Sequence, residues 1–342
     1  MNRRHGPLLV ALASILSVTA AAAPAADLNV PSTMRAAAFD RGGGPEVLMI
    51  HQLPVPVPDV GQVLIAVHSA GVAVWEADFR QHPSERVRFP AVIGSDGAGT
   101  IVTLGPDVHG FKVGDEVYGT ANGFYAEYVR ARADRIAHLP KGVGLTGAGV
   151  LAISGLSALQ GIDDVLQLKT GETLIIHGAA GGVGTLAIQL AKLRGAKVLA
   201  TASTAEGLEL ARKLGADAVV NGRSGDIATA AQQFAPHGVD AVLGLAGGDG
   251  LERCIDALRR DGPGRVAYLY GLEPIPRPRG AIRMILYSFV SGSSELQRLN
   301  KAVEAGRMRV PVAAEYPLAQ AGEAHRRLAA GHLLGKIALR AP

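Results

Sequence analysis

The stretch HGAAGGVGTLAIQLAK, His177–Lys192, decides the fold. It follows a short apolar run, ETLIIH, and passes directly into a helical pattern. This strand–turn–helix order matches the fingerprint G-x-G-x-x-G, with Ala179 in the first position and Gly181 and Gly184 in the second and third. The first position makes the tight turn, Gly181 lets the main chain approach a pyrophosphate, and Gly184 lets the helix pack on the strand. We therefore predict a loop that binds a dinucleotide at a helix N-terminus.

Short apolar runs and helical patterns alternate on both sides of this loop, from Glu172 to Leu269. Such alternation is typical of parallel strands joined by crossover helices, so the sequence predicts a doubly wound α/β domain. Gly195 and Gly215 follow two of the helical patterns, where a helix C-terminus often needs a positive φ. The residues predicted to bind the cofactor are Ala179, Gly181, Gly182, Val183, Gly184, Ser203, Ser157 and Gly247.

The strand predicted after this helix, KVLATA, ends without an acidic residue: Thr201, Ala202 and Ser203 stand at its tip. NAD-binding sites usually place Asp or Glu there to bind the ribose 2′-hydroxyl, and a carboxylate would repel a 2′-phosphate. The sequence therefore favours NADP(H) over NAD. Ser203 also forms S-x-x-E with Glu206, which is typical of a helix capping box.

The flanking segments have a different pattern. From Met34 to about Ser154, short β-branched runs are separated by Gly and Pro, which predicts a β-rich, barrel-like unit. From about Ser294 to Arg340, two helical stretches precede a closing strand, LLGKIALR.

Composition excludes several classes of protein. The net charge is only +4 over 342 residues, no run of five Lys or Arg occurs, and aromatic residues make up 4%. Surfaces that bind nucleic acid need a denser basic patch or stacking platforms, so no nucleic-acid partner is expected. Cys254 is the only cysteine, so it forms no intrachain disulfide and no multi-thiolate zinc site. Its apolar spacing in LERCIDALRR predicts a buried helix position.

The first 26 residues have the layout of a secretory signal peptide. A basic start precedes an apolar run, Leu8–Val18, and small residues end at Ala23 or Ala26. This run is shorter than the ~20 residues that a membrane span needs, so we expect no stable span. The sequence thus predicts an exported, periplasmic protein. Alternatively, the protein starts at Met34 and is cytoplasmic.

Ordered motifs cover most of the chain, and together they resemble the zinc-independent quinone oxidoreductase and enone reductase branch of the medium-chain dehydrogenase/reductase superfamily. The motifs that carry the resemblance are Met34–Leu48, Ala70–Val72, Phe89–Gly99, Val113–Gly119, Gly123–Val129, Ala179–Gly184, Leu214–Asp217 and Gly335–Leu339.

The resemblance implies the fold class α/β, with a GroES-like β-rich catalytic domain and a doubly wound Rossmann cofactor domain. The catalytic domain would comprise residues 34–155, completed by 295–342, and the Rossmann domain residues 156–294. The resemblance also implies that cofactor and substrate meet in an interdomain cleft, and that the protein is a homodimer.

The chain departs from related proteins at three places. Zinc alcohol dehydrogenases have Cys and a His-Glu pair where this chain has Ala73 or its neighbours and Gly94-Ser95-Asp96, so the sequence predicts no metal site. Many quinone reductases have Asn where Ala73 stands. Relatives that prefer NADPH often have Lys or Arg where Gly207 stands, so the 2′-phosphate would need Arg212, Arg223 or helix-end amides.

These observations predict an NADPH-dependent oxidoreductase that transfers hydride to a quinone or an α,β-unsaturated carbonyl without zinc. The alternative is a catalytically weak NADPH-binding sensor or carrier of the same fold. The substrate would be a small carbonyl or quinone, and the protein would act by positioning it against the nicotinamide. The predicted catalytic residues are Tyr270, Trp75 and Arg80, and Tyr125 and Ser157 are further candidates for lining the cleft.

Overall fold

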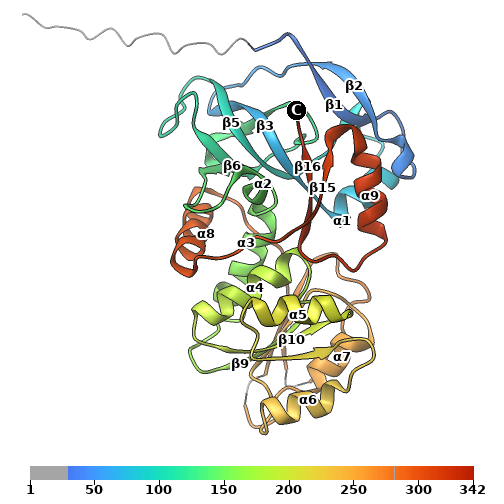
Figure 1. Ribbon diagram of the computed structural model, residues 1–342, viewed down its shortest axis with the longest axis vertical. Coiled ribbons are helices and arrows are strands. Elements are labelled where there is room, and N and C mark those ends of the chain that lie inside the picture. Colours follow the sequence, from blue (N-terminus) through green and yellow to red (C-terminus); the bar gives the residue numbers. More distant parts are fainter. Residues whose placement is uncertain (1–29, 263, 281) are drawn as a thin grey trace, which may run out of the picture.

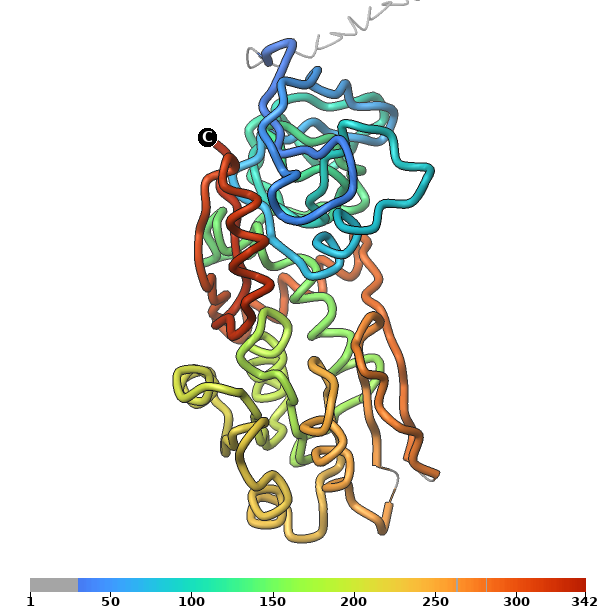
Figure 2. The backbone as a smooth tube through the Cα atoms, turned by 90° about the vertical axis from the view of Figure 1, so that its right-hand side faces the viewer, coloured from blue at the N-terminus to red at the C-terminus, as the bar shows by residue number. Residues whose placement is uncertain are grey.

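The computed structural model describes residues 30–262, 264–280 and 282–342. A β-rich domain and a parallel α/β domain lie end to end along the long axis of the molecule (Figure 1). The same division is visible after a quarter turn (Figure 2). The predicted fold class, a GroES-like β-rich domain beside a doubly wound Rossmann domain, is confirmed. The predicted signal peptide lies outside the described residues.

The Rossmann sheet has six strands, all parallel, in the order β11-β10-β9-β12-β13-β14. The chain starts at the central strand β9, builds one side, and then returns to β12 on the other side. Ligands of open α/β sheets bind at the carboxyl ends of the strands where this reversal occurs. The strands are β9 (Thr173–His177), β10 (Lys197–Ala202), β11 (Ala218–Asn221), β12 (Ala241–Gly244), β13 (Arg265–Leu269) and β14 (Arg283–Tyr287).

Helices cover both faces of this sheet, so its central strands β9 and β12 are mainly apolar and buried. In β9, Leu174 and Ile176 pack into one core with residues of α4 and α3, whereas Ile175 packs into the other with residues of α6 and α7. Cys254 is fully buried in this second core, which confirms its predicted position. The helices are α3 (Ala152–Gln160), α4 (Gly182–Leu193), α5 (Ala205–Lys213), α6 (Ile227–Phe234), α7 (Asp249–Asp256) and α8 (Ser293–Gly306).

The β-rich domain contains a seven-stranded sheet and a three-stranded sheet. The C-terminal strand β16 pairs with β3 in antiparallel register, Ile337 opposite Val72, so the tail of the chain completes the larger sheet. The remaining elements are β1 (Thr33–Phe39), β2 (Met49–Pro54), β3 (Gln62–Val72), α1 (Val74–Gln81), β4 (Ala91–Val92), β5 (Asp96–Leu104), β6 (Glu116–Thr120), β7 (Tyr128–Arg132), β8 (Ile136–His138), α2 (Leu145–Ala148), β15 (Val312–Pro317), α9 (Ala321–Ala329) and β16 (Lys336–Arg340).

Two helices carry the chain between the domains. Helix α3 runs without a break across the expected boundary at residues 155 and 156, and α8 does the same at 294 and 295. These helices lie against each other in the middle of the molecule (Figure 1). They pack closely because Gly155 has no side chain: a Cβ there would lie 2.7 Å from Leu299 Cδ2. The passage between domains is therefore a packed helix pair rather than a loop.

The start of β16 holds the two domains together directly. The Gly335 N–H donates to the carbonyl of Ala180, in the glycine loop, over 2.8 Å. The next residue, Lys336, places its ammonium 2.8 Å from both carboxylate oxygens of Asp96, at the start of β5. Asp96 is fully buried and Lys336 is 7% exposed. Removing either partner would leave a buried charge without its counter-ion.

We predict that Lys336→Met lowers the free energy of unfolding by about 3–5 kcal/mol, since Asp96 would stay buried and unpaired. Urea denaturation followed by circular dichroism measures this loss. The double variant K336M/D96N removes both charges and should recover part of it. If the free energy of unfolding of the single variant lies within about 1 kcal/mol of the wild-type value, the ion pair does not stabilise the fold as predicted.

Candidate functional site

The glycine loop connects the end of β9 to the start of α4. Its left-handed residue is Gly178, with φ of +86°, and not Ala179, so the tight turn begins one residue earlier than predicted. Ala179 is fully buried instead. At Gly184 a Cβ would lie 2.5 Å from the Gly178 carbonyl oxygen and 2.6 Å from Ala179 Cα. No side chain fits there, so Gly184 lets helix α4 pack against the turn.

The N-terminus of α4 is open to a ligand. Gly181 is the N-cap, and no side chain caps the helix. The first N–H groups of a helix have no intrahelical acceptor, and the helix dipole favours an anion beside them. Gly182 and Val183 form the first turn and are partly exposed. The loop can therefore hold a phosphate group on main-chain donors.

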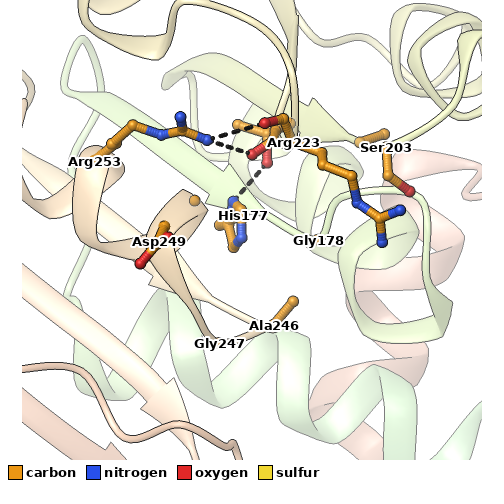
Figure 3. Close-up of a pocket in the computed structure, with 12 residues that line it drawn as sticks. His177, Gly178, Ser203, Arg223, Ala246, Gly247, Asp249 and Arg253 are labelled. Carbon is orange, nitrogen blue, oxygen red and sulfur yellow. Dashed lines mark hydrogen bonds between the residues drawn. The ribbon is translucent and has the colours of Figure 1, made fainter.

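A pocket of about 430 Å³ lies beside this loop, at the carboxyl ends of β9, β10 and β12 (Figure 3). It occupies the position that the reversed strand order predicts for a ligand. The residues that line it are His177, Gly178, Thr201, Ala202, Ser203, Gly222, Arg223, Ala246, Gly247, Asp249, Gly250 and Arg253.

Two arginines make this pocket basic. Arg253 donates to the main-chain carbonyls of Gly222 and Arg223, over 3.1 and 3.3 Å. The Arg223 side chain extends toward the Ser203 side of the pocket (Figure 3). Neither guanidinium forms an ion pair with any carboxylate of the described chain. Arg223 can therefore meet an anionic ligand, whereas Arg253 also fixes the main chain beneath it.

His177 forms the floor of the pocket in its neutral form. Its Nδ1 lies 2.8 Å from Thr201 Oγ1, and its side chain is largely buried. Burial, with a smaller effect of the Arg253 charge, lowers the pKa of His177 to about 4. Cys254 lies behind it, with Sγ 3.7 Å from Nδ1, and burial raises the pKa of this thiol to about 12. Neither group is ionised near neutral pH.

The predicted capping box at Ser203 and Glu206 is wrong. Helix α5 begins one residue later, and Thr204 is its N-cap, accepting a hydrogen bond from the Gly207 N–H over 3.1 Å. The Ser203 hydroxyl lies 2.8 Å from His332 Nδ1 and also lines the pocket. Ser203 is thus available to a ligand because Thr204 caps the helix.

The other predicted cofactor contacts lie at different depths. Gly247 lines the pocket, and a Cβ there would lie 2.3 Å from the Glu273 carbonyl oxygen. Ser157 lies inside α3 and is 3% exposed, and its carbonyl accepts a hydrogen bond from the Tyr287 hydroxyl. Ser157 therefore does not contribute to the described pocket.

The predicted catalytic residues do not form one cluster. Tyr270 follows β13 and is 77% exposed, whereas Trp75, at the start of α1, is 48% exposed. Arg80 is 3% exposed, and its Nη1 donates to the carbonyl of Gly43. Tyr125 is fully buried. Arg80 and Tyr125 thus belong to the interior of the catalytic domain and line no open cleft, because the core packed over α1 covers them.

The centre of this buried region is Glu76, to which the sequence analysis assigned no role. Its carboxylate accepts hydrogen bonds from the Ala73 N–H, the Ser95 N–H and the Tyr125 hydroxyl, over 2.9, 2.7 and 2.8 Å. Burial raises the pKa of Glu76, although Lys336 acts in the opposite direction. The Tyr125 hydroxyl also lies 3.2 Å from His325, whose pKa burial lowers to about 4.

These partners were hard to find from sequence. Asp96 and Lys336 lie in two recognisable motifs, but 240 residues separate them along the chain. Within the described ranges, no group of three or more His, Cys, Asp or Glu side chains could hold a metal ion. Of the positions where zinc enzymes have ligands, Ala73 offers no donor side chain and Asp96 is bound to Lys336.

Comparisons with known proteins agree with this architecture. Residues 59–141 match the family described as alcohol dehydrogenase GroES-like domain, and residues 214–339 match the family described as zinc-binding dehydrogenase. Quinone oxidoreductase of Mus musculus is 33% identical over 85% of this chain and 93% of its own length. A 2-haloacrylate reductase of Burkholderia is 30% identical over 89% of this chain and 98% of its own.

A solved structure extends the comparison. The quinone oxidoreductase of Escherichia coli, complexed with NADPH, superposes with a TM-score of 0.79 at 26% identity, covering 90% of this chain and 99% of its own. These matches agree with the glycine loop, the pocket at the carboxyl ends of β9, β10 and β12, and the two-domain fold. Together they place the chain in a family. It belongs to the quinone oxidoreductase branch of the medium-chain dehydrogenase/reductase superfamily and is an oxidoreductase.

Proposed function

We propose that this protein uses NADPH to reduce a quinone or an α,β-unsaturated carbonyl by hydride transfer, without zinc. One observation carries the proposal. An uncapped helix N-terminus, packed on the glycine loop through Gly184, where no Cβ fits, opens beside a pocket with two arginines that form no ion pair with a carboxylate of the described residues. This is the arrangement that the diphosphate and ribose of a dinucleotide require.

The choice of NADPH rests on the charges beside the adenosine ribose. Strand β10 ends at Ala202, and the next side chain is the Ser203 hydroxyl rather than a carboxylate. Arg223 extends toward Ser203, whereas Asp249 lies on the opposite side, next to Arg253 (Figure 3). A hydroxyl and a guanidinium together suit a 2′-phosphate. Arg212, another candidate, lies 3.5 Å from Glu209 and does not line the pocket.

Independence from zinc rests on the chemistry of the donor set. A catalytic zinc site needs three protein ligands from His, Cys, Asp or Glu. Ala73 supplies none, and the Ser95 hydroxyl is a poor ligand for zinc. Both oxygens of Asp96 contact the Lys336 ammonium, so that carboxylate is already neutralised. The residues present do not fit a zinc ion at this place.

Without a metal, the chain's own residues position the reactants. The nicotinamide, when bound, supplies the hydride. The glycine loop and the β16 junction fix the cofactor domain against the catalytic domain, so that two bound molecules meet in one geometry. The relatives are named for a quinone and a 2-haloacrylate, both conjugated electrophiles. A conjugated acceptor is therefore the class we propose for this chain.

A sensor or carrier with little turnover is the alternative. Ala73 stands where many quinone reductases have an amide, and Arg80 and Tyr125 are buried, so three candidate polar contacts to a substrate are missing. The enzymatic relatives favour turnover over this alternative.

We also propose a homodimer that pairs through β14. This strand is the edge of the Rossmann sheet, and Leu286 in it is 50% exposed. An exposed apolar edge strand is a template for pairing with a second chain.

No helix of the described ranges could cross a membrane. We propose export, with a start at Met34 as the alternative, and sequencing the mature N-terminus distinguishes the two.

The first prediction from this proposed function concerns turnover. The purified protein, treated with a chelator, should oxidise NADPH steadily when given an enone or a quinone, as followed by the absorbance of the reduced nicotinamide. Tight NADPH binding without turnover on any acceptor of a broad panel would favour the sensor instead. Loss of activity on chelation, restored by zinc, would contradict the metal-free mechanism.

The second prediction concerns coenzyme choice. Arg223→Ala should raise the KM for NADPH about 10- to 100-fold, the range expected when a hydrogen bond to a charged group is lost, and leave the KM for NADH unchanged. Arg212→Ala, outside the pocket, is the matched control and should change neither value. An equal effect of R223A on both coenzymes would disprove recognition of the 2′-phosphate.

The third prediction concerns assembly. Leu286→Lys places a charge on the exposed edge of β14 and should convert dimers to monomers in sedimentation velocity. Ile50→Lys on β2, the exposed edge strand of the three-stranded sheet, is the control and should leave the dimer intact. A wild-type protein that sediments as a monomer would refute the proposed pairing.

A further inference from the structure

A hydrogen-bonded pair, Trp75 and Ser95, joins the first turn of helix α1 to the residue before strand β5. Helix α1, which begins at Val74, lies at the end of the β-rich domain that faces the Rossmann domain (Figure 1). Trp75 is 48% exposed, Val74 is 70% exposed, and Ser95 is half-buried beside them. Trp75 is therefore accessible at this end of the domain, and Ser95 is partly exposed beside it.

The Ser95 hydroxyl is oriented by its neighbours. The Trp75 indole N–H donates to Ser95 Oγ over 3.0 Å, and the Ser95 main-chain N–H donates to Glu76 over 2.7 Å. An indole N–H can only donate, so Ser95 Oγ must accept from it, and its own proton points elsewhere. No acceptor for that proton occurs in the part of the chain that the structure describes. The Ser95 hydroxyl is thus a hydrogen-bond donor whose oxygen is oriented by Trp75, and the Ser95 main chain is held by Glu76.

The glycine loop lies close to this donor. Asp96, next to Ser95, holds the ammonium of Lys336, which also lies 5.9 Å from the centre of the Trp75 ring. At the other end of the lysine side chain, a Cβ on Gly182 would lie 3.3 Å from Lys336 Cβ. The Lys336 side chain therefore extends from Asp96 and Trp75, beside the Ser95 donor, to the N-terminus of α4. A dinucleotide held by that helix would extend its reactive end toward the catalytic domain.

We propose that Ser95, positioned by Trp75, donates a hydrogen bond to the oxygen of the acceptor on which negative charge develops. This inference rests on the proposed function and identifies the side chain that would contact the oxygen of the acceptor. When a hydride, with its two electrons, reaches the β-carbon of an enone, the C=C π pair shifts and the charge accumulates on the carbonyl oxygen. Ser95 keeps its proton and stabilises this oxyanion, and solvent then supplies the proton to the α-carbon.

Trp75 is the only tryptophan, so its fluorescence reports directly on this place. The probe is 4-nitrophenolate, whose oxygen carries the charge that the reaction would develop. It is titrated into the protein with NADP⁺ present, and quenching of Trp75 emission gives the Kd. The neutral methyl ether of the same phenol is the ligand control. Ser84→Ala, on the exposed loop after α1, is the protein control.

Ser95→Ala should weaken the binding of the phenolate about 10- to 100-fold and leave the neutral ether unaffected. Ser95→Thr should restore most of the affinity, since it keeps the hydroxyl. Equal affinity of wild type and S95A for the phenolate, including no measurable binding by either, overturns the inference. If the difference is present but the wild type reduces no acceptor, the oxyanion contact stands and the proposed reductase function fails.

Discussion

The hydrogen bond from Gly335 to Ala180, with the buried pair of Lys336 and Asp96 beside it, sets the position of one domain against the other. Each contact joins segments that lie far apart in the sequence. Gly335 can approach the loop because it has φ of +106° and a Cβ there would lie 2.2 Å from the Pro311 carbonyl oxygen. The glycine loop is consequently part of the contact between the domains as well as the proposed ligand site.

Two regions with different charge lie on either side of this contact. The pocket beside the glycine loop is basic, and its histidine stays neutral because it is buried. At the catalytic end, Lys336 neutralises Asp96, and the buried Glu76 carboxylate accepts hydrogen bonds from two main-chain N–H groups and the Tyr125 hydroxyl. The basic pocket would thus attract a negatively charged cofactor, while the other end offers apolar surface and a few oriented donors. Such a division suits hydride transfer to a neutral conjugated acceptor.

The sequence predicted those features that depend on residues close together along the chain. The period of the apolar runs and the glycines of the loop led to the parallel sheet, its helices and the position of Cys254. One-residue errors remained at Ala179 and Ser203, because the choice of left-handed residue and of helix cap depends on close packing. Partners such as Glu76 with Tyr125 were out of reach, since burial and long-range pairing follow from the tertiary fold.

Transfer of an isotopic label tests the central claim most directly. The metal-free protein is incubated with an enone and NADPH that carries deuterium at C4 of the nicotinamide, using each C4 epimer in turn, and the product is examined by mass spectrometry. The account predicts one deuterium on the β-carbon of the product from one epimer only, because a single bound geometry delivers the hydride. Product without deuterium from either epimer, or labelled equally by both, would contradict it.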